Sequence, residues 1–212
     1  YFLWANAVAE RVLQKYPDKW FGTLAYNGIA EPPTKVSVHP RIVPFITYDR
    51  MRWEDPELRD FGHQLTERWA EVSPVLGWYD YAYGISYLTP RVYFHRMQQY
   101  LSWGAKHHVQ FHYAELYPNW GEGPKPWVFT QLLWNPDQDV DALLNDWYRH
   151  FAGEQAAPQL RGFYDIWEKF WTQDIYKSKW NRDTGQYLPF NIAPGYLLDI
   201  PQSYITQSDG FM

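Results

Sequence analysis

Four polar side chains stand at the ends of short runs of apolar and aromatic residues, which span 21–27, 42–49, 75–81 and 109–115. These side chains are Asn27, Asp49, Asp80 and Glu115. Hydrolysis of a glycosidic bond needs two carboxyl groups, a neutral one that protonates the leaving oxygen and an ionised one that acts as nucleophile or base. The pattern therefore nominates Asp49, Asp80 and Glu115 as catalytic residues. Each also has a structural alternative, which for Asp49 is an ion pair with Arg50 or Arg52.

Aromatic residues make up 20% of the chain, with 13 Trp and 18 Tyr. Their flat apolar faces and polar tips suit ligands that present both C–H and O–H groups. Arginine suits a carboxylate, so an acidic sugar is a possible substrate. The candidate substrate-binding residues are Asn27, Tyr48, Arg50, Trp78, Tyr113, Trp120 and Glu122. The alternative for most of the rings is ordinary core packing, and for the arginine it is solvated surface charge.

Composition argues against several other classes of function. The net charge of −5 gives no electrostatic support for a nucleic-acid or anionic-membrane partner. No apolar run approaches the ~20 residues that span a bilayer. The chain has no cysteine, which removes thiolate chemistry and disulfides. His107, His108 and His112 do not form a recognised metal motif, so we expect neither a metal nor another cofactor.

The four runs have the length and composition of strands, and helical segments separate the later ones. Asp55 followed by Pro56 predicts a helix to about residue 72, and Thr89 followed by Pro90 predicts another to about residue 104. A third is expected over 125–134. Alternation of strands and helices predicts parallel strands joined by right-handed crossovers. Prolines disfavour a full helix between the first two strands.

Four parallel strands are half of an eight-stranded barrel, in which the chemistry lies at the carboxyl ends of the strands. A doubly wound sheet is the alternative, but it should carry a glycine-rich phosphate turn that this sequence lacks. Side-chain alternation allows an inward set of Thr47 with Asp49, Trp78 with Asp80, and Tyr113 with Glu115. The prediction is an α/β fold, the C-terminal half of a (β/α)8 TIM-type barrel followed by a helical region.

Three parts of the chain are distinguished by pattern. Residues 1–138 form the half-barrel, 139–172 carry helical stripes interrupted at Gly153, and 173–212 read as an irregular tail or the start of a further segment. The chain opens directly in a helical pattern with Phe2, Val8 and Val12 on one stripe, continuing to Tyr16. A helix that begins without a cap indicates a fragment of a longer protein.

Several motifs resemble a bacterial family of domains of unknown function, DUF4838. The similarity runs from residue 1 to about Trp171, over FLWANAVA (2–9), LAYNGIAEPP (24–33), TYDR (47–50), GWYDYAY (77–83), PRVYFH (90–95) and AELYPNWGEG (114–123). Members of that family look like relatives of α-glucuronidase and hexosaminidase barrels. The resemblance implies a polysaccharide-degrading protein, with an extracytoplasmic location favoured.

The resemblance also implies that the four strands are the fifth to the eighth of the barrel. The general acid at the end of the fourth strand would then precede Tyr1, in a missing N-terminal half supplied by the same protein or by a dimer partner. The leading hypothesis is a glycoside-hydrolase-like domain acting on a polysaccharide or oligosaccharide, with an acidic one among the candidate substrates. The alternative is a non-catalytic carbohydrate-binding module with an aromatic cleft.

Overall fold

The computed structural model describes residues 1–84, 87–117, 121–183 and 194–211, which form a mixed α/β fold. Its single described sheet has four parallel strands in the order β1-β2-β3-β4. The strands are β1 (Phe21–Ala25), β2 (Ile42–Tyr48), β3 (Leu76–Asp80) and β4 (Val109–Ala114). All four predicted strands are confirmed, although β1 ends two residues before Asn27. The parallel order places all four carboxyl ends at one edge of the sheet.

The helices that connect strands are α2 (Pro56–Ala70) and α3 (Phe94–Lys106), and α4 (Lys125–Trp134) follows β4. Asp55 caps α2 by accepting a hydrogen bond from the Glu57 amide at 2.9 Å, with Pro56 in the first turn, as the sequence predicts. The predicted start of α3 after Thr89 is wrong, because the helix begins at Phe94. The preceding residues are buried and non-helical, and the Arg91 guanidinium there is bound to Asp49. The first crossover holds only the short 3₁₀ turn η1 (Asn27–Ile29).

One face of the sheet is packed against helices through a layer of tryptophans. The Trp78 ring lies 5.4 Å from the Trp53 ring and stacks at 6.1 Å on Trp103 of α3. Trp53 belongs to the 3₁₀ segment η2 (Arg50–Glu54), which follows β2. A Cβ atom at Gly104 would lie 2.6 Å from the Trp78 ring, so only glycine lets α3 approach this closely. The ring layer therefore fixes the distance between α3 and the sheet.

The opposite face of the sheet carries large side chains that remain exposed. Leu24 and Phe111 are each 43% exposed, and Tyr113 is 57% exposed. A cavity of about 270 Å³ on this face is lined partly by Leu24, Phe45, Tyr79 and Tyr113. We call this side of the sheet the open face. Parallel sheets are ordinarily covered on both faces, so the open face is a distinctive feature of the chain.

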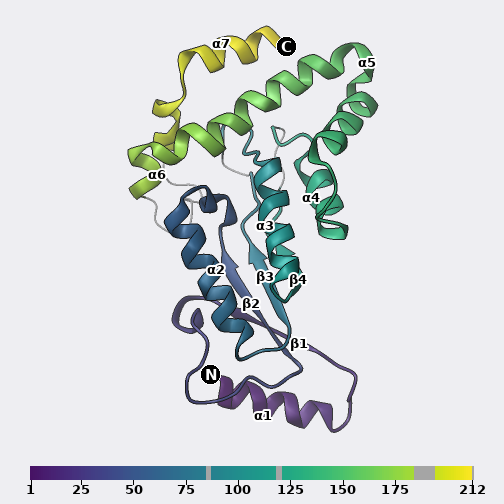
Figure 1. The fold of residues 1–212 in the computed structure, drawn as a ribbon, viewed down its shortest axis with the longest axis vertical. Coiled ribbons are helices and arrows are strands. Elements are labelled where there is room, and N and C mark those ends of the chain that lie inside the picture. Colours follow the sequence, from purple (N-terminus) through teal and green to yellow (C-terminus); the bar gives the residue numbers. More distant parts are fainter. Residues whose placement is uncertain (85–86, 118–120, 184–193, 212) are drawn as a thin grey trace.

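The C-terminal helices lie across the end of the molecule toward which the strands run, and α1 (Phe2–Leu13) lies at the other end (Figure 1). The long helix α5 (Val140–Lys169) is broken at Gly153, where φ is +77°, as the helical stripes predict. It continues into the π-helical turn η3 (Phe170–Asp174) and the 3₁₀ turn η4 (Ile175–Lys177). The predicted division of the chain at residues 138 and 172 stays a prediction.

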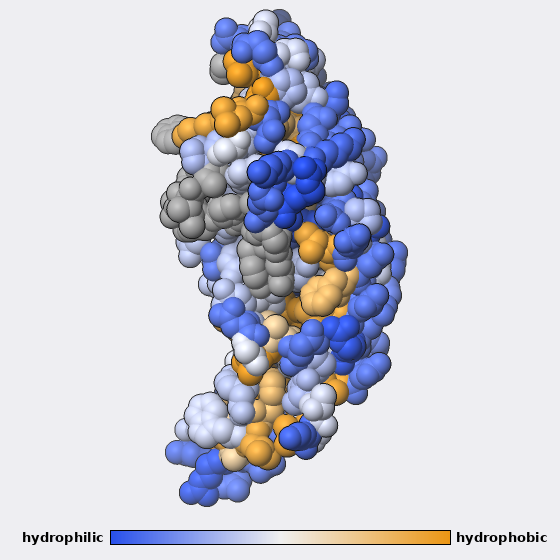
Figure 2. All heavy atoms as spheres, turned by 90° about the vertical axis from the view of Figure 1, so that its left-hand side faces the viewer, coloured by the Kyte–Doolittle hydropathy of each residue, from blue (hydrophilic) through white to orange (hydrophobic). Residues whose placement is uncertain are grey.

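Two expectations about the chain ends are corrected. Residues 173–212 are not simply irregular, because they include α6 (Lys179–Asp183), the 3₁₀ turn η5 (Pro194–Asp199) and α7 (Gln202–Phe211). In α1, Phe2 and Ala9 are buried, whereas Val8 of the predicted stripe is exposed. Figure 2 shows hydrophobic side chains on the surface at the lower end of the molecule, where α1 lies. None of the helices in the described ranges combines the length and apolar character needed to cross a bilayer.

Candidate functional site

Glu115 lies at the carboxyl edge of the sheet, immediately after β4, and is half-buried. Its amide donates to the Asp80 carbonyl at 2.9 Å, so the strand pairing extends to this residue. Strand alternation places its side chain with Tyr113 on the open face, as predicted. The neighbouring Tyr79 hydroxyl donates to Glu115 Oε1 at 2.6 Å, and the Tyr79 and Tyr113 rings stack at 4.9 Å. The structure therefore brings one predicted carboxylate together with two tyrosines.

The Tyr79–Glu115 contact has a clear chemical direction. Burial and the bond to Glu115 raise the pKa of Tyr79, so the phenol keeps its proton and acts as donor. The carboxyl oxygen of Glu115 is therefore the acceptor in this contact, and a carboxylate is the group that a nucleophile or a general base requires. The exposed ring of Tyr113 offers an apolar face beside it.

Asp49 lies at the end of β2 in a fully buried ion pair. Arg91 Nη2 donates to both carboxylate oxygens at 2.8 Å, and neither side chain is exposed. The Met51 amide also donates to Asp49 Oδ1 at 3.3 Å, which caps the 3₁₀ turn that follows. The anticipated cap is therefore present, and Arg91, which lies between β3 and α3, is an arginine partner that the sequence did not indicate. In this position the Asp49 carboxylate stabilises the backbone turn that follows β2.

The predicted orientation of β3 is wrong, because Trp78 and Asp80 point toward the helices. Trp78 is 0% exposed within the tryptophan layer, and Asp80 is 1% exposed. Asp80 Oδ1 accepts hydrogen bonds from the Arg50 amide at 3.2 Å and the Tyr81 amide at 2.9 Å. The side chain on the open face is Tyr79. Because β3 has aromatic residues on both sides, no polar contrast was available to orient the strand.

Arg50, nominated to read an acidic sugar, is fully buried beneath the strand ends. Its guanidinium donates to the Ile46 carbonyl at 3.0 Å and the Tyr79 carbonyl at 3.1 Å. It also lies 4.0 Å from the centre of the Trp78 ring and 3.8 Å from Asp80 Oδ1. These contacts bind β2 to β3 and place the guanidinium on the helix-packed side of the sheet.

Glu122 is buried rather than displayed on a loop. Its carboxylate pairs with Lys125 and packs against Gly84. Burial raises the pKa of Glu122 and lowers that of Lys125 to about 8, with the paired charges opposing both shifts. Lys125 Nζ also donates to the Arg91 carbonyl at 2.8 Å, so this pair lies beside the Asp49–Arg91 pair.

The other nominated residues have different surroundings. Asn27 is exposed just beyond β1 with a φ of +50°, a backbone conformation that asparagine tolerates. Tyr48 is 1% exposed and faces α2, where its hydroxyl donates to the Leu58 carbonyl at 3.3 Å. Trp120 lies outside the described residues. Asn27 therefore remains at the accessible edge of the sheet, whereas Tyr48 belongs to the core.

Sequence reasoning missed Tyr79, Arg91 and Lys125. Tyr79 had no local signal, because its pairing with Tyr113 depends on the register of β3 against β4. The signal for Lys125 was its spacing of three residues from Glu122. Arg91 had no local signal, because its partner is 42 residues away in the chain.

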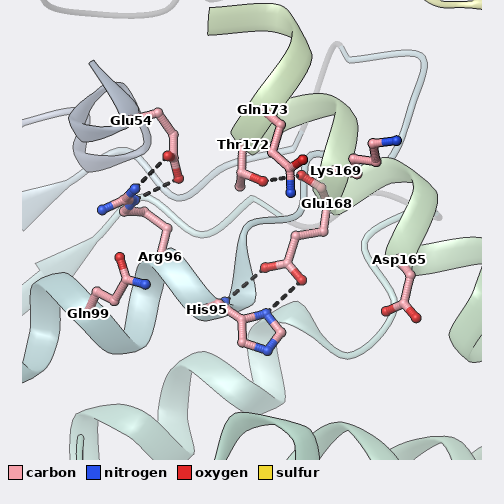
Figure 3. Close-up of a pocket in the computed structure, with 9 residues that line it drawn as sticks. All are labelled: Glu54, His95, Arg96, Gln99, Asp165, Glu168, Lys169, Thr172 and Gln173. Atoms are coloured by element: carbon pink, nitrogen blue, oxygen red, sulfur yellow. Dashed lines mark hydrogen bonds and ion pairs between the residues drawn. The ribbon is translucent and has the colours of Figure 1, made fainter. Parts of the chain in front are cut away.

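A polar cavity of about 390 Å³ lies away from these residues, between α3 and the end of α5 (Figure 3). Its charged side chains are largely paired with one another. Arg96 donates to both oxygens of Glu54, at 2.6 and 2.5 Å, and Glu168 accepts from the His95 amide at 2.8 Å and contacts His95 Nδ1 at 2.9 Å. Glu168 thus caps the first turn of α3, which has no acidic residue of its own.

Among the described residues, no group of three or more histidine, aspartate or glutamate side chains is arranged to hold a metal ion. Residues 1–165 match the model of a family described as a domain of unknown function, DUF4838. The match covers more than half of the 212 residues, so the chain belongs to this family. Searches of curated proteins and of solved structures give no significant match.

Proposed function

We propose that this DUF4838 domain is half of a (β/α)8 barrel that is completed by another segment of the same protein or by a dimer partner. The proposal is supported by four parallel strands in sequential order, with an α-helix in the connections from β2 to β3 and from β3 to β4. It is also supported by the open face, which exposes Leu24, Phe111 and Tyr113 on the side that would be a barrel interior.

The proposed activity is a glycoside-hydrolase-like reaction on a polysaccharide or oligosaccharide at the carboxyl ends of the strands. The observation that carries this proposal is the half-buried Glu115 held by the Tyr79 hydroxyl beside the exposed Tyr113 ring. Aromatic faces suit the C–H side of a sugar ring, and an ionised carboxylate suits a developing positive charge or an attacking water.

Glu115 is proposed as nucleophile or general base. Asp49 and Asp80 are candidates for supporting roles, because both are buried and bound to cationic or amide donors. The second carboxyl group of the catalytic pair would come from the other half of the barrel. The acidic-sugar proposal depended on Arg50, whose guanidinium is bound to strand carbonyls, and the environment of Glu115 is better suited to a neutral sugar.

The test is a comparison of Glu115→Gln with Glu154→Gln in the full-length protein that carries this domain. Glu154 is exposed on α5 and serves as a matched control. Release of reducing sugars from neutral xylan, glucuronoxylan and polygalacturonate would be measured by anion-exchange chromatography. We expect Glu115→Gln to lower turnover by about 100-fold or more, with the control unchanged. Equal turnover in the two variants on every substrate would reject the catalytic role.

A second candidate function is non-catalytic saccharide binding. It is favoured by the burial of Asp49, Asp80 and Glu122 in ion pairs or hydrogen bonds, which leaves Glu115 as the accessible nominated carboxylate. In this case calorimetry should show polysaccharide binding that survives Glu115→Gln and is lost in Tyr113→Ala. Loss of binding in both variants would contradict a purely aromatic platform.

A further inference from the structure

His95 lies in the first turn of α3, and both nitrogens of its ring face carboxylate oxygens of α5. Nδ1 lies 2.9 Å from Glu168 Oε2, and Nε2 lies 3.5 Å from Asp141 Oδ1. Glu168 also accepts the His95 amide at 2.8 Å, so one carboxylate holds both the ring and the backbone of this residue (Figure 3). The ring therefore contacts both ends of α5, the helix that is broken at Gly153.

This arrangement fits the charged form of the His95 ring. A neutral imidazole has one N–H donor and one acceptor nitrogen, so it can donate to only one carboxylate and turns a lone pair toward the other. An imidazolium has two donors and meets both carboxylates with the opposite charge. The hydrogen bond to Glu168 raises the pKa of His95 against the opposing effect of burial, and the charges of Glu168 and Asp141 add to the rise.

The other ionisable side chains around the ring have partners of their own. They are Glu54, Arg96, Arg161, Asp165 and Lys169. Arg161 binds Asp165 and shares Asp141 with His95, and Arg96 binds Glu54. Lys169 is exposed and lies 5.4 Å from the centre of the Tyr204 ring. The nearby cations disfavour a further positive charge, but their own partners reduce that effect, and the two carboxylates in contact with the ring favour it.

The contact between His95 and Glu168 holds one end of the segment that leads into α3. Glu168 and Trp171 lie within one turn of each other, at the end of α5 and in η3. Trp171 Nε1 donates to the Pro90 carbonyl at 2.6 Å and holds the other end of the same segment. Arg91, which binds the buried carboxylate at the end of β2, lies between these two attachments. Loss of the His95 contact would therefore leave this segment attached at one end only.

We propose that His95 is a pH-dependent clasp between α3 and α5, closed in its imidazolium form and released when the ring loses its proton. The neutral ring keeps one hydrogen bond at most and loses its attraction to Asp141. Because the pKa of His95 is raised in the folded chain, the contact is fully present below pH 6.5 and is lost as the pH rises through the raised value. The segment that carries Arg91 is then held more firmly in mild acid than in mild alkali. This clasp does not depend on the proposed hydrolytic activity.

Two NMR measurements on the 212-residue chain test the clasp. The ring of His95 should titrate with a midpoint above 6.5. Its amide donates to Glu168, so the protection of this amide against hydrogen exchange should be highest in mild acid and should fall as the pH rises through that midpoint. Linkage relates the two results, because the protection should change about 10-fold for each pH unit by which the midpoint exceeds 6.5.

Variants separate the clasp from a purely structural contact. In His95→Gln the protection of the same amide, corrected for the intrinsic effect of pH on exchange, should not change with pH. Glu168→Gln should lower the midpoint of His95, and so should Asp141→Asn, which alters an exposed position and leaves the core intact. The exposed controls His150→Gln and Glu154→Gln should keep the original midpoint and pH response. The proposal is overturned if the midpoint is 6.5 or lower, if protection is constant in the unmodified chain, if the response survives His95→Gln, or if neither carboxylate variant lowers the midpoint.

Discussion

Arg91 Nη2 lies 2.8 Å from both carboxylate oxygens of Asp49, in an ion pair with no exposed side-chain surface. The other terminal nitrogen, Nη1, donates to the carbonyls of Tyr81 and Tyr83 at 2.7 and 2.8 Å. One guanidinium therefore connects the end of β2 to the segment that follows β3. This buried contact therefore helps to hold the loops at the carboxyl edge of the sheet in place.

Removing the guanidinium should be strongly destabilising. Arg91→Met removes the guanidinium that binds both oxygens of the buried Asp49, and the expected cost of breaking this buried pair is about 3–5 kcal/mol in the free energy of unfolding. Urea denaturation at neutral pH would measure it. The control is Arg149→Met, which removes an exposed pair with Glu154 and should cost about 0–1 kcal/mol. Similar losses in both variants would contradict a special role for the buried pair.

Tyr79 should act as a positioning residue for Glu115. Tyr79→Phe removes the 2.6 Å hydrogen bond but keeps the ring that stacks on Tyr113. If Glu115 is catalytic, kcat should fall about 10- to 100-fold, as for loss of a bond to a charged group, with little change in KM. Steady-state kinetics on the substrate identified above would measure this. Tyr117→Phe, at a 50% exposed neighbouring position, is the control, and an equal fall in kcat there would refute the assignment.

Acid should destabilise the fold through His112. The native ring stays neutral down to a pH of about 3, whereas the unfolded chain takes up the proton near pH 6.5. Between these values the unfolded state binds more protons, so stability is present above pH 6.5 and is lost as the pH falls. The contribution is up to about 1.4 kcal/mol per pH unit.

Urea denaturation between pH 7 and pH 4.5 would test this linkage. The unfolding free energy of His112→Phe should fall less steeply with decreasing pH than that of the unmodified chain, since this residue no longer titrates. His150→Phe should retain the original slope, because His150 is exposed. Parallel curves for all three proteins would show that His112 does not contribute to acid sensitivity.

The break in α5 depends on one backbone conformation. Gly153 has a φ of +77°, and a Cβ atom added there would meet no neighbouring atom. Gly153→Ala should therefore destabilise by about 1 kcal/mol through backbone strain alone. Gly210→Ala in α7 also points into open space but without a positive φ, so it should be neutral or stabilise by up to about 1 kcal/mol. Thermal unfolding compares the two, and a stabilised Gly153→Ala would contradict the strain argument.

The sequence was sufficient to predict the strands, their parallel order and most crossover helices. Short apolar runs separated by helical periods define those elements locally, and the Asp55–Pro56 cap identifies the start of α2. The start of α3 could not be predicted from Thr89 and Pro90, because a contact between Arg91 and Asp49, distant in sequence, holds that segment out of the helix. The helix α7 was missed because its sequence has no lasting apolar period and contains Gly210.

The site was only partly predictable for a similar reason. Glu115 and Tyr113 could be placed on one face by alternation, since they are two positions apart, but alternation alone did not show that this is the open face. Trp78 and Tyr79 are both aromatic, so alternation along β3 could not show which faced the helices. Asp49 and Glu122 are buried because they pair with Arg91 and Lys125. Composition and spacing do not show where these two cationic side chains point.

The contact between Trp78 and Gly104 has an evolutionary consequence. Because even a methyl group at position 104 would overlap the indole, neither residue can change freely while its partner is retained. Relatives with a side chain at position 104 should carry a smaller residue at position 78, so the two columns of a family alignment should covary. Trp78 and Gly104 would then be retained or replaced together during evolution, although they lie 26 positions apart in the chain.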